Sequence, residues 1–319
     1  MTAWRVRAFE ERDYPAYSRI ASLAEGRRLD AVQARAEDAR WDRSRYDQAR
    51  VVAVDEEDAP VGYAEIHHDP SRYDPQRYVL RLGADTDRRR RGIGAALWDR
   101  VALELSARSA KVVGLWTGDA TACQAFIAKR GFIEVGRMYQ QVIAVAAAPL
   151  PTPAAEERVT AHGTTVTTLA ALRDAVGDDR ALEAAWDLHS ACRLEFVTLG
   201  RATPQPFAEW REENVTGAAA LPDAHFIALD GSRYVGVCSL LRESDDTLRI
   251  GLTGVLPAYR RRGIARLLKL RAHAWARAHG FSEIHTTTTK ANAAMLALND
   301  ALGYPIVASW GGYELRLGS

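Results

Sequence analysis

One unit of sequence occurs twice in this chain of 319 residues. An arginine- and glycine-rich segment, Arg89–Gly94, returns as Arg260–Ala265 after 260 − 89 = 171 residues. Two further pairs follow the same order at nearly the same offset, namely Gly131-Phe132 with Gly303-Tyr304, and Val61-Gly62 with Val235-Gly236. Ordered matches at a near-constant offset, in a chain of about twice that length, predict two copies of one fold.

Apolar periodicity predicts alternating strands and helices in each copy. The first copy has expected strands at 4–9, 50–54, 60–67, 78–83 and 111–116, a final strand pair at 132–135 and 138–145, and helices within 13–40, from 93 and at 121–129. The second copy has expected strands at 164–169, 224–241 as a hairpin, 247–255, 283–288 and 308–317, and helices near 180–194, 263–279 and 292–302. This order predicts an α/β fold, with a mixed, mostly antiparallel sheet flanked by helices in each copy.

A segment rich in Pro and Ala, 146–155, separates the copies and has no periodic pattern. Such composition is typical of an inter-domain linker. We therefore expect an N-terminal domain at 1–147, a linker at 148–163 and a C-terminal domain at 164–319.

Composition argues against several classes of partner. The 42 basic and 41 acidic side chains leave a formal charge of +1, which provides no net attraction to nucleic acid or to an anionic membrane. Cys123, Cys192 and Cys238 lie far apart without CxxC spacing, and His67-His68 lacks a third ligand, so we expect neither a disulfide framework nor a metal. No apolar run suits a signal peptide or a membrane span. We expect a cytoplasmic monomer or homodimer.

The repeated Arg/Gly segment lies between an expected strand and an expected helix. The start of a helix presents unpaired backbone N–H groups, and glycine lets a phosphate approach them closely. Arg-x-x-Gly-x-Gly/Ala at this position therefore predicts an anion-binding loop. It matches neither the three-glycine dinucleotide fingerprint nor a Walker loop.

These loops resemble the acyl-CoA-binding loop of the GNAT superfamily of N-acyltransferases, whose pattern is Q/R-x-x-G-x-G/A, often after Val-x-Pro. The second copy matches through Val255, Pro257, Arg260, Gly263 and Ala265; the first keeps Arg89, Gly92 and Gly94 but has Ala84 and Thr86 in place of Val and Pro. The resemblance spans both halves and implies a tandem GNAT protein. It implies binding of the CoA pyrophosphate by the second loop, and of the pantetheine arm by the preceding strand, through Thr253, Gly254, Val255, Arg260, Arg261, Arg262, Gly263, Ile264 and Ala265. The corresponding residues of the first copy are Arg89, Arg90, Arg91, Gly92, Ile93 and Gly94.

The superfamily's second signature is an Asn that opens the next helix, with a Tyr seven residues later that protonates the departing thiolate. The second copy has Asn292 and Asn299 at these places, and the first has Ala120 and Ile127. The resemblance implies that Asn292 binds pantetheine, although an Asn there is also a preferred helix N-cap. The segment 292–304 also resembles the C-terminal halves of tandem members that include the mycothiol synthase group, in which the C-terminal half is catalytic.

Acyl transfer to an amine requires a group that takes up a proton. Some relatives place a glutamate four residues before the valine, where this chain has Gly251 and, in the first copy, Leu80. We therefore expect the catalytic groups among Glu195, Glu243 and Asn299, with Glu209 and Glu213 as further candidate bases. His189, Tyr304 and Tyr313 are weaker candidates, because these residue types more often have structural roles at such positions.

The sequence thus predicts an N-acetyltransferase that moves an acetyl group from acetyl-CoA, without a metal, to a primary amine of a small molecule. Direct transfer in a ternary complex is expected at the C-terminal domain, while the N-terminal domain is degenerate. The alternative is a CoA-binding scaffold or sensor in which neither half catalyses, which the missing tyrosines favour.

Overall fold

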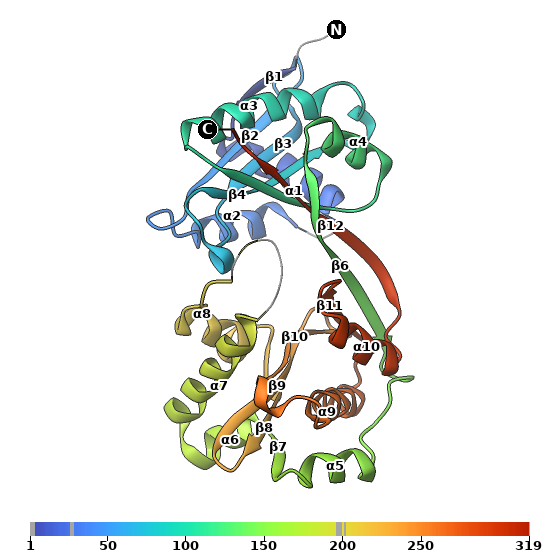
Figure 1. The fold of residues 1–319 in the computed structure, drawn as a ribbon. Helices are drawn as coiled ribbons and strands as arrows, with labels where there is room; N and C mark the ends of the chain where they lie inside the picture. Colours follow the sequence, from blue (N-terminus) through green and yellow to red (C-terminus); the bar gives the residue numbers. More distant parts are fainter. Residues whose placement is uncertain (1–3, 26–28, 196–199, 201, 319) are drawn as a thin grey trace. The chain divides into compact units, whose positions relative to one another are not determined.

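The computed structural model describes residues 4–25, 29–195, 200 and 202–318. Its contacts divide the chain into two compact units. The first comprises Met1–Val135 together with Trp310–Ser319, and the second comprises Gly136–Ser309. Each unit is an α/β domain with a mixed, mostly antiparallel sheet, as the sequence predicts (Figure 1).

The first unit contains a sheet with helices on both faces. Helices α1 (Tyr14–Glu25) and α2 (Ala31–Ala39) pack on one face, while α3 (Ile93–Ala107) and α4 (Thr121–Lys129) pack on the other. Among the described strand pairs of this unit, only β4 and β5 run parallel. The strands lie in the order β1 (Arg5–Ala8), β2 (Gln48–Val54), β3 (Pro60–His67), β4 (Arg77–Ala84), β5 (Val112–Thr117) and the end of β12 (Ile306–Arg316).

The second unit repeats this arrangement. Helices α5 (Pro153–Thr160), α9 (Ile264–Ala278) and α10 (Ala293–Ala301) contribute to the core on one face. The other face carries α6 (Leu169–Val176), α7 (Asp178–Arg193), α8 (Phe207–Arg211) and a π-helical turn, Glu212–Thr216. The strand order is β6 (Ile133–Ala144), β11 (Glu283–Thr289), β10 (Thr247–Val255), β9 (Arg233–Arg242), β8 (Ala220–Asp230) and β7 (Thr164–Thr168).

The final strands differ from the prediction in two ways. The expected strand pair at 132–145 is a single strand, β6, because Gly136-Arg137 continues the extended chain instead of turning. The two copies also exchange their last strands. β6 pairs with β11 of the second unit, and Gly311–Arg316 of β12 pairs with β5 of the first. The red end of the chain in Figure 1 accordingly lies within the first unit. Residues 136–147, expected in the N-terminal domain, therefore belong to the second unit, and residues 310–319, expected in the C-terminal domain, belong to the first.

The expected linker contains a helix. Thr152 caps α5 by accepting a hydrogen bond from the backbone nitrogen of Ala155, and Pro153 occupies the first turn. Val159 is buried in the core of the second unit, and Glu156 forms an ion pair with Arg271 of α9 at 2.6 Å. These contacts fix α5 against the second unit.

In the described part of the chain, no helix combines the length and the apolar composition that a membrane crossing needs.

Candidate functional site

The two parallel strands of the second unit separate after a short paired stretch. β10 and β11 pair only from Thr247 to Arg249, although they continue to Val255 and Thr289. A β-bulge lies in β10 at the separation, around Gly251, where the hydroxyl of Ser239 accepts a hydrogen bond from the backbone nitrogen of Leu252 at 3.1 Å. Bulges bend strands. The backbone of β10 that faces β11 is therefore open beyond Arg249.

Gly251 occupies the position at which some relatives have a glutamate. A Cβ atom there would lie 2.9 Å from both Leu241 Cδ1 and Ser239 Oγ. A side chain at this place would therefore require Leu241 and Ser239 to shift. A base cannot come from this position, in agreement with the sequence prediction.

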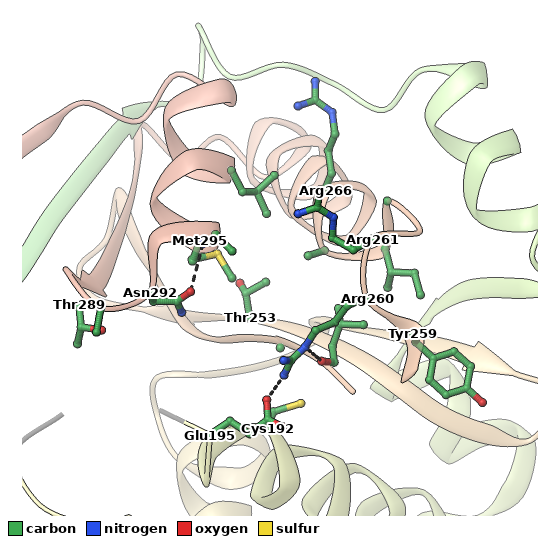
Figure 2. A pocket seen from close by; sticks show the side chains of 18 residues that line it. Cys192, Glu195, Thr253, Tyr259, Arg260, Arg261, Arg266, Thr289, Asn292 and Met295 are labelled. Carbon is green, nitrogen blue, oxygen red and sulfur yellow. Dashed lines mark hydrogen bonds and ion pairs between the residues drawn. The ribbon is translucent and has the colours of Figure 1, made fainter. Parts of the chain in front are cut away.

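A cavity of about 460 Å³ lies in the opening between the strands. Its wall includes the end of β10, the Arg/Gly loop, the first turn of α9 and one side of α10 (Figure 2). The residues that line it are Cys192, Glu195, Thr253, Gly254, Val255, Tyr259, Arg260, Arg261, Gly263, Ile264, Ala265, Arg266, Thr289, Ala291, Asn292, Ala294, Met295 and Leu298. The cavity therefore brings together all the residues predicted to bind CoA in the second copy except Arg262.

The two Arg/Gly loops have the same backbone conformation. Gly263 and Gly92 both have φ of 88° and both cap the following helix, while Arg261 and Arg90 have φ of 67° and 62°. A positive φ is uncommon for arginine and is often found at functional sites. The conformation turns the chain so that the N–H groups that precede the first hydrogen bonds of α9 and α3 remain available to an anion.

Arg260 holds the loop to the neighbouring elements. Its Nε donates to the carbonyl of Val255 at 3.1 Å, and its guanidinium forms an ion pair with Glu195 (Figure 2). In the first copy Arg89 makes the equivalent bond to the carbonyl of Ala84 at 3.3 Å. The repeated arginine therefore braces the end of the strand. Glu195, a candidate base, lines the cavity but is engaged by this arginine.

The two asparagines of α10 have different environments. Asn292 lines the cavity and caps α10, since its Oδ1 accepts from the backbone nitrogen of Met295 at 3.2 Å. Asn299 is fully buried and lies outside the cavity wall. Its Nδ2 donates to Gln141 at 2.8 Å and to Thr288 at 3.1 Å. Asn299 therefore joins α10 to β6 and β11, and it reaches no group in the cavity.

Glu243 lies beside a histidine that the sequence interpretation overlooked. His285 of β11 has Nδ1 at 2.7 Å from a carboxylate oxygen of Glu243 and Nε2 at 3.1 Å from Glu283. His285 pairs with Arg249, so both side chains lie on the same face of the sheet. Arg249 reaches Glu213 of the π-helical turn at 3.4 Å on that face. His285 thus lies where the two strands begin to separate, on the side opposite α9.

Glu243 and His285 lie outside the cavity wall, and so do the remaining candidate acids and bases. Tyr304 is buried, its hydroxyl is 2.7 Å from Nε2 of His273, and burial raises its pKa well above the usual value. Tyr313 belongs to the first unit. Glu209 is exposed on α8, and Glu213 accepts from Gln205 at 3.2 Å.

Two buried histidines lie on the α7 face of the second unit. Burial lowers the pKa of His189 to about 4 and that of His225 to about 3, and the ring of Trp210 packs near both. Within the described part of the chain, neither ring nitrogen of His225 has a hydrogen-bond partner. Both imidazoles are therefore neutral in the folded protein, and neither lines the cavity.

We expect the second unit to lose stability as the pH falls below about 6.5, the ordinary pKa of histidine in an unfolded chain. The pKa values of the two histidines are lower in the folded protein than in the unfolded chain, so folding excludes protons from them. The free energy of unfolding is therefore greatest above pH 6.5 and falls on acidification by about 1.4 kcal/mol per pH unit for each histidine. Denaturant unfolding at pH 7 and pH 5 measures the loss, and His225→Phe should reduce it by about 2 kcal/mol. An equal loss in this variant would contradict the assignment.

The sequence interpretation missed several residues of the cavity wall. Tyr259 and Arg266 directly flank the predicted loop, whereas the others come from elements that only tertiary structure brings to it, namely Cys192, Thr289, Met295 and Leu298. Cys192 packs closely on β10, since a Cβ atom on Gly254 would lie only 2.6 Å from the Cβ atom of Cys192. The one available signal was the spacing of Ala294, Met295 and Leu298, which places them on one side of α10.

Comparison with known proteins agrees with this geometry. The model of the acetyltransferase (GNAT) family matches residues 10–132 and again residues 182–304. The chain belongs to the acetyltransferase (GNAT) family, and it is a tandem member. No curated protein sequence matches the chain. Among the described residues of this GNAT protein, no group of three His, Cys, Asp or Glu side chains is placed to hold a metal.

Solved structures of this family resemble the whole chain. A GCN5-related N-acetyltransferase from Sphaerobacter thermophilus has 18% identity and a TM-score of 0.71, with 100% of this chain and 98% of that chain covered. A tandem GNAT protein from the clavulanic acid biosynthesis pathway has 16% identity and a TM-score of 0.69, with 99% of both chains covered. A glucosamine N-acetyltransferase region of a fungal GH3 β-N-acetylglucosaminidase has 14% identity and a TM-score of 0.72, with 99% of this chain and 38% of that chain covered. At these identities the likeness concerns the fold.

Proposed function

We propose that the second unit is an N-acetyltransferase that moves an acetyl group from acetyl-CoA to a primary amine of a small molecule. The observation that carries the proposal is the opening between β10 and β11, with the anion-binding loop at the start of α9 on its wall. A pantetheine arm could pair with the open edge of β10 at Thr253–Val255 like an additional strand. The pyrophosphate would then meet the backbone N–H groups of Arg261–Ala265.

The residues present suit this co-substrate. The left-handed Gly263 exposes the loop backbone, and the cavity continues along β10 to Met295 and Leu298 of α10, which offer an apolar surface. The Oδ1 of Asn292 accepts the hydrogen bond of the helix cap, which leaves its Nδ2 to donate a hydrogen bond to the ligand. In the transfer the amine nitrogen would bond to the acetyl carbon, the thioester C–S bond would break, and CoA would leave as a thiolate, which a thiol pKa of about 8.5 permits. The protein must provide an acceptor for the proton of the amine.

We propose that His285 takes up the proton of the amine. Its imidazole does not line the cavity but lies at the point where the strands separate, with Nδ1 2.7 Å from Glu243 and Nε2 3.1 Å from Glu283. These carboxylates can orient the ring, and one of them must release its nitrogen before that nitrogen takes up the proton of the amine. A histidine that is oriented by a carboxylate can take up the proton of an attacking amine, which is an ordinary form of general base catalysis. The assignment makes Glu243 a positioning residue. It leaves Glu195 as a partner of Arg260.

The first unit is proposed to be degenerate. Its strands β4 and β5 also separate, after Val79 and Gly114, and its loop repeats the glycine conformation. However, Ala120 offers no side-chain cap to α4, and Ile127 is buried in the core. The ring of Phe126, the counterpart of Leu298 at an offset of 172, would lie 3.4 Å from a Cβ atom on Gly94. An aromatic ring thus packs against the loop where the second unit has a smaller side chain.

Thiol release from acetyl-CoA, measured with a panel of small primary amines, tests the proposal. Release that depends on an added amine, with mass spectrometry of the acetylated product, would support catalysis. Calorimetric binding of CoA without turnover of any amine would instead support the scaffold or sensor interpretation. Absence of CoA binding would contradict both.

A further inference from the structure

We propose that Arg158 of α5 binds a phosphate of the acyl-CoA, so that the segment between the two copies is part of the site. The inference rests on the proposed function of the second unit. It assigns a binding residue to a helix that lies outside both repeated sequences.

Arg158 lies directly against the loop. Its Nη2 donates to the carbonyl of Arg261 at 3.4 Å. A Cβ atom on Gly263 would lie 3.1 Å from Cδ and 3.2 Å from Nε of this arginine. Its side chain therefore runs past the glycine whose backbone begins the anion-binding turn.

The helix that carries Arg158 is held in place independently of this contact. Val159, the next residue, is buried in the core of the second unit, and Glu156 pairs with Arg271 of α9 at 2.6 Å. Thr152 caps the first turn of α5. Because the backbone is fixed by these residues, the guanidinium is presented to the loop without a need for the phosphate to order the helix.

The charge of Arg158 is not neutralised by the protein. Among the described residues, no carboxylate forms an ion pair with it, whereas the neighbouring Arg260 pairs with Glu195. A cation beside the start of a helix also faces the positive end of the helix dipole, which is unfavourable. Arg158 is exposed, so water solvates its charge. A bound phosphate would offset the unfavourable contact with the helix dipole, and its oxygens would accept charge-assisted hydrogen bonds from the guanidinium.

The first copy provides a comparison within the same chain. Among the described residues other than its chain neighbours, none would meet a Cβ atom on Gly92 within 4 Å, so no counterpart of Arg158 packs on that glycine. There the indole nitrogen of Trp4 donates to the carbonyl of Arg91 at 2.7 Å. The carbonyl equivalent to that of Arg261 is the one of Arg90, so Trp4 bonds the next carbonyl along the first loop. The first loop thus has an uncharged donor nearby and no counterpart of the Arg158 contact among the described residues. This difference fits a second unit that binds the coenzyme more tightly.

Calorimetry with CoA and with 3′-dephospho-CoA tests the proposal on the full chain. A Gly92→Glu background limits binding to the second loop. Arg158→Gln should weaken CoA binding about 10-fold or more, as expected for the loss of a charge-assisted bond. Arg158→Lys should recover part of the affinity, since it keeps the charge but loses the planar fork. Arg180→Gln, which removes an exposed arginine of α7 in the same unit, should leave the affinity unchanged.

The two ligands identify the phosphate. An equal loss for CoA and 3′-dephospho-CoA in Arg158→Gln would assign the guanidinium to the pyrophosphate, and a loss for CoA alone would assign it to the 3′-phosphate. Unchanged CoA affinity in a folded Arg158→Gln protein would overturn the proposal while the proposed function stands. If the parent protein with an intact second loop binds no CoA, both fall. The melting temperature confirms that each variant is folded.

Discussion

A Gly263→Glu protein should lose acetyl transfer by about 100-fold or more, because the new carboxylate would stand where the loop receives phosphate. Repulsion between two anions opposes binding, and the side chain also covers backbone N–H groups that the ligand needs. Thiol release from acetyl-CoA and CoA calorimetry measure the effect. We expect CoA binding at the second loop to be lost together with turnover.

Gly92→Glu is the matched control for backbone strain. Both glycines have φ of 88° and both cap a helix, so a non-glycine residue at either position should cost a similar roughly 1–2 kcal/mol. Gly92→Glu should therefore carry a similar backbone strain, without the contact that a Cβ atom on Gly263 makes with Arg158 at 3.1 Å, while leaving most of the turnover intact. Normal turnover in folded Gly263→Glu would contradict the assignment of the loop. Loss of turnover in Gly92→Glu, with CoA still bound at the second loop, would give the first unit a catalytic role.

The loop could be predicted from sequence because its function depends on a local conformation. A glycine at the start of a helix, after a strand, suffices to expose backbone N–H groups, and these positions are adjacent in the chain. The same holds for Asn292, whose capping bond spans three residues. The repeat then predicted that the two loops lie in two copies of the same fold, which the two family matches confirm.

The strand exchange could not be predicted in this way. The last strands of both copies follow similar Gly-aromatic pairs and have similar apolar patterns, so each could complete either sheet. Strand pairing between distant segments depends on register and on turns. Here the absence of a turn at Gly136-Arg137 sends β6 to the second unit, and β12 then completes the first.

Asn299, Arg158 and His285 illustrate why the remaining site could not be derived. Asn299 falls at the family's tyrosine position, but its buried bonds to Gln141 and Thr288 direct it away from the cavity. Arg158 and His285 lie in segments without a motif. Each gains its place from contacts between elements distant in sequence, so no spacing along the chain marks them.

Replacing His285 by Ala should lower kcat by about 100-fold or more, the usual range for loss of a general base. Glu243→Gln should lower it by about 10-fold, since the imidazole remains but loses the carboxylate that orients it. His162→Ala, which changes an exposed histidine of the same unit, should have no effect. Thiol release at saturating acetyl-CoA measures each rate. Glu195→Gln should mainly weaken CoA binding, because Glu195 braces Arg260.

The pH profile of kcat separates this role from a structural one. With a base in the site, the rate of the parent enzyme should rise with pH and then level off, because Tyr304 is buried away from the cavity with a raised pKa and supplies no falling limb. In His285→Ala the rate should continue to rise toward the pKa of the free amine, near ~10 for an alkylammonium, since only deprotonated acceptor can then react. An unchanged profile with a uniformly lower rate would make His285 structural. A loss of the plateau in Glu195→Gln instead would transfer the base to Glu195, whose carboxylate lines the cavity wall.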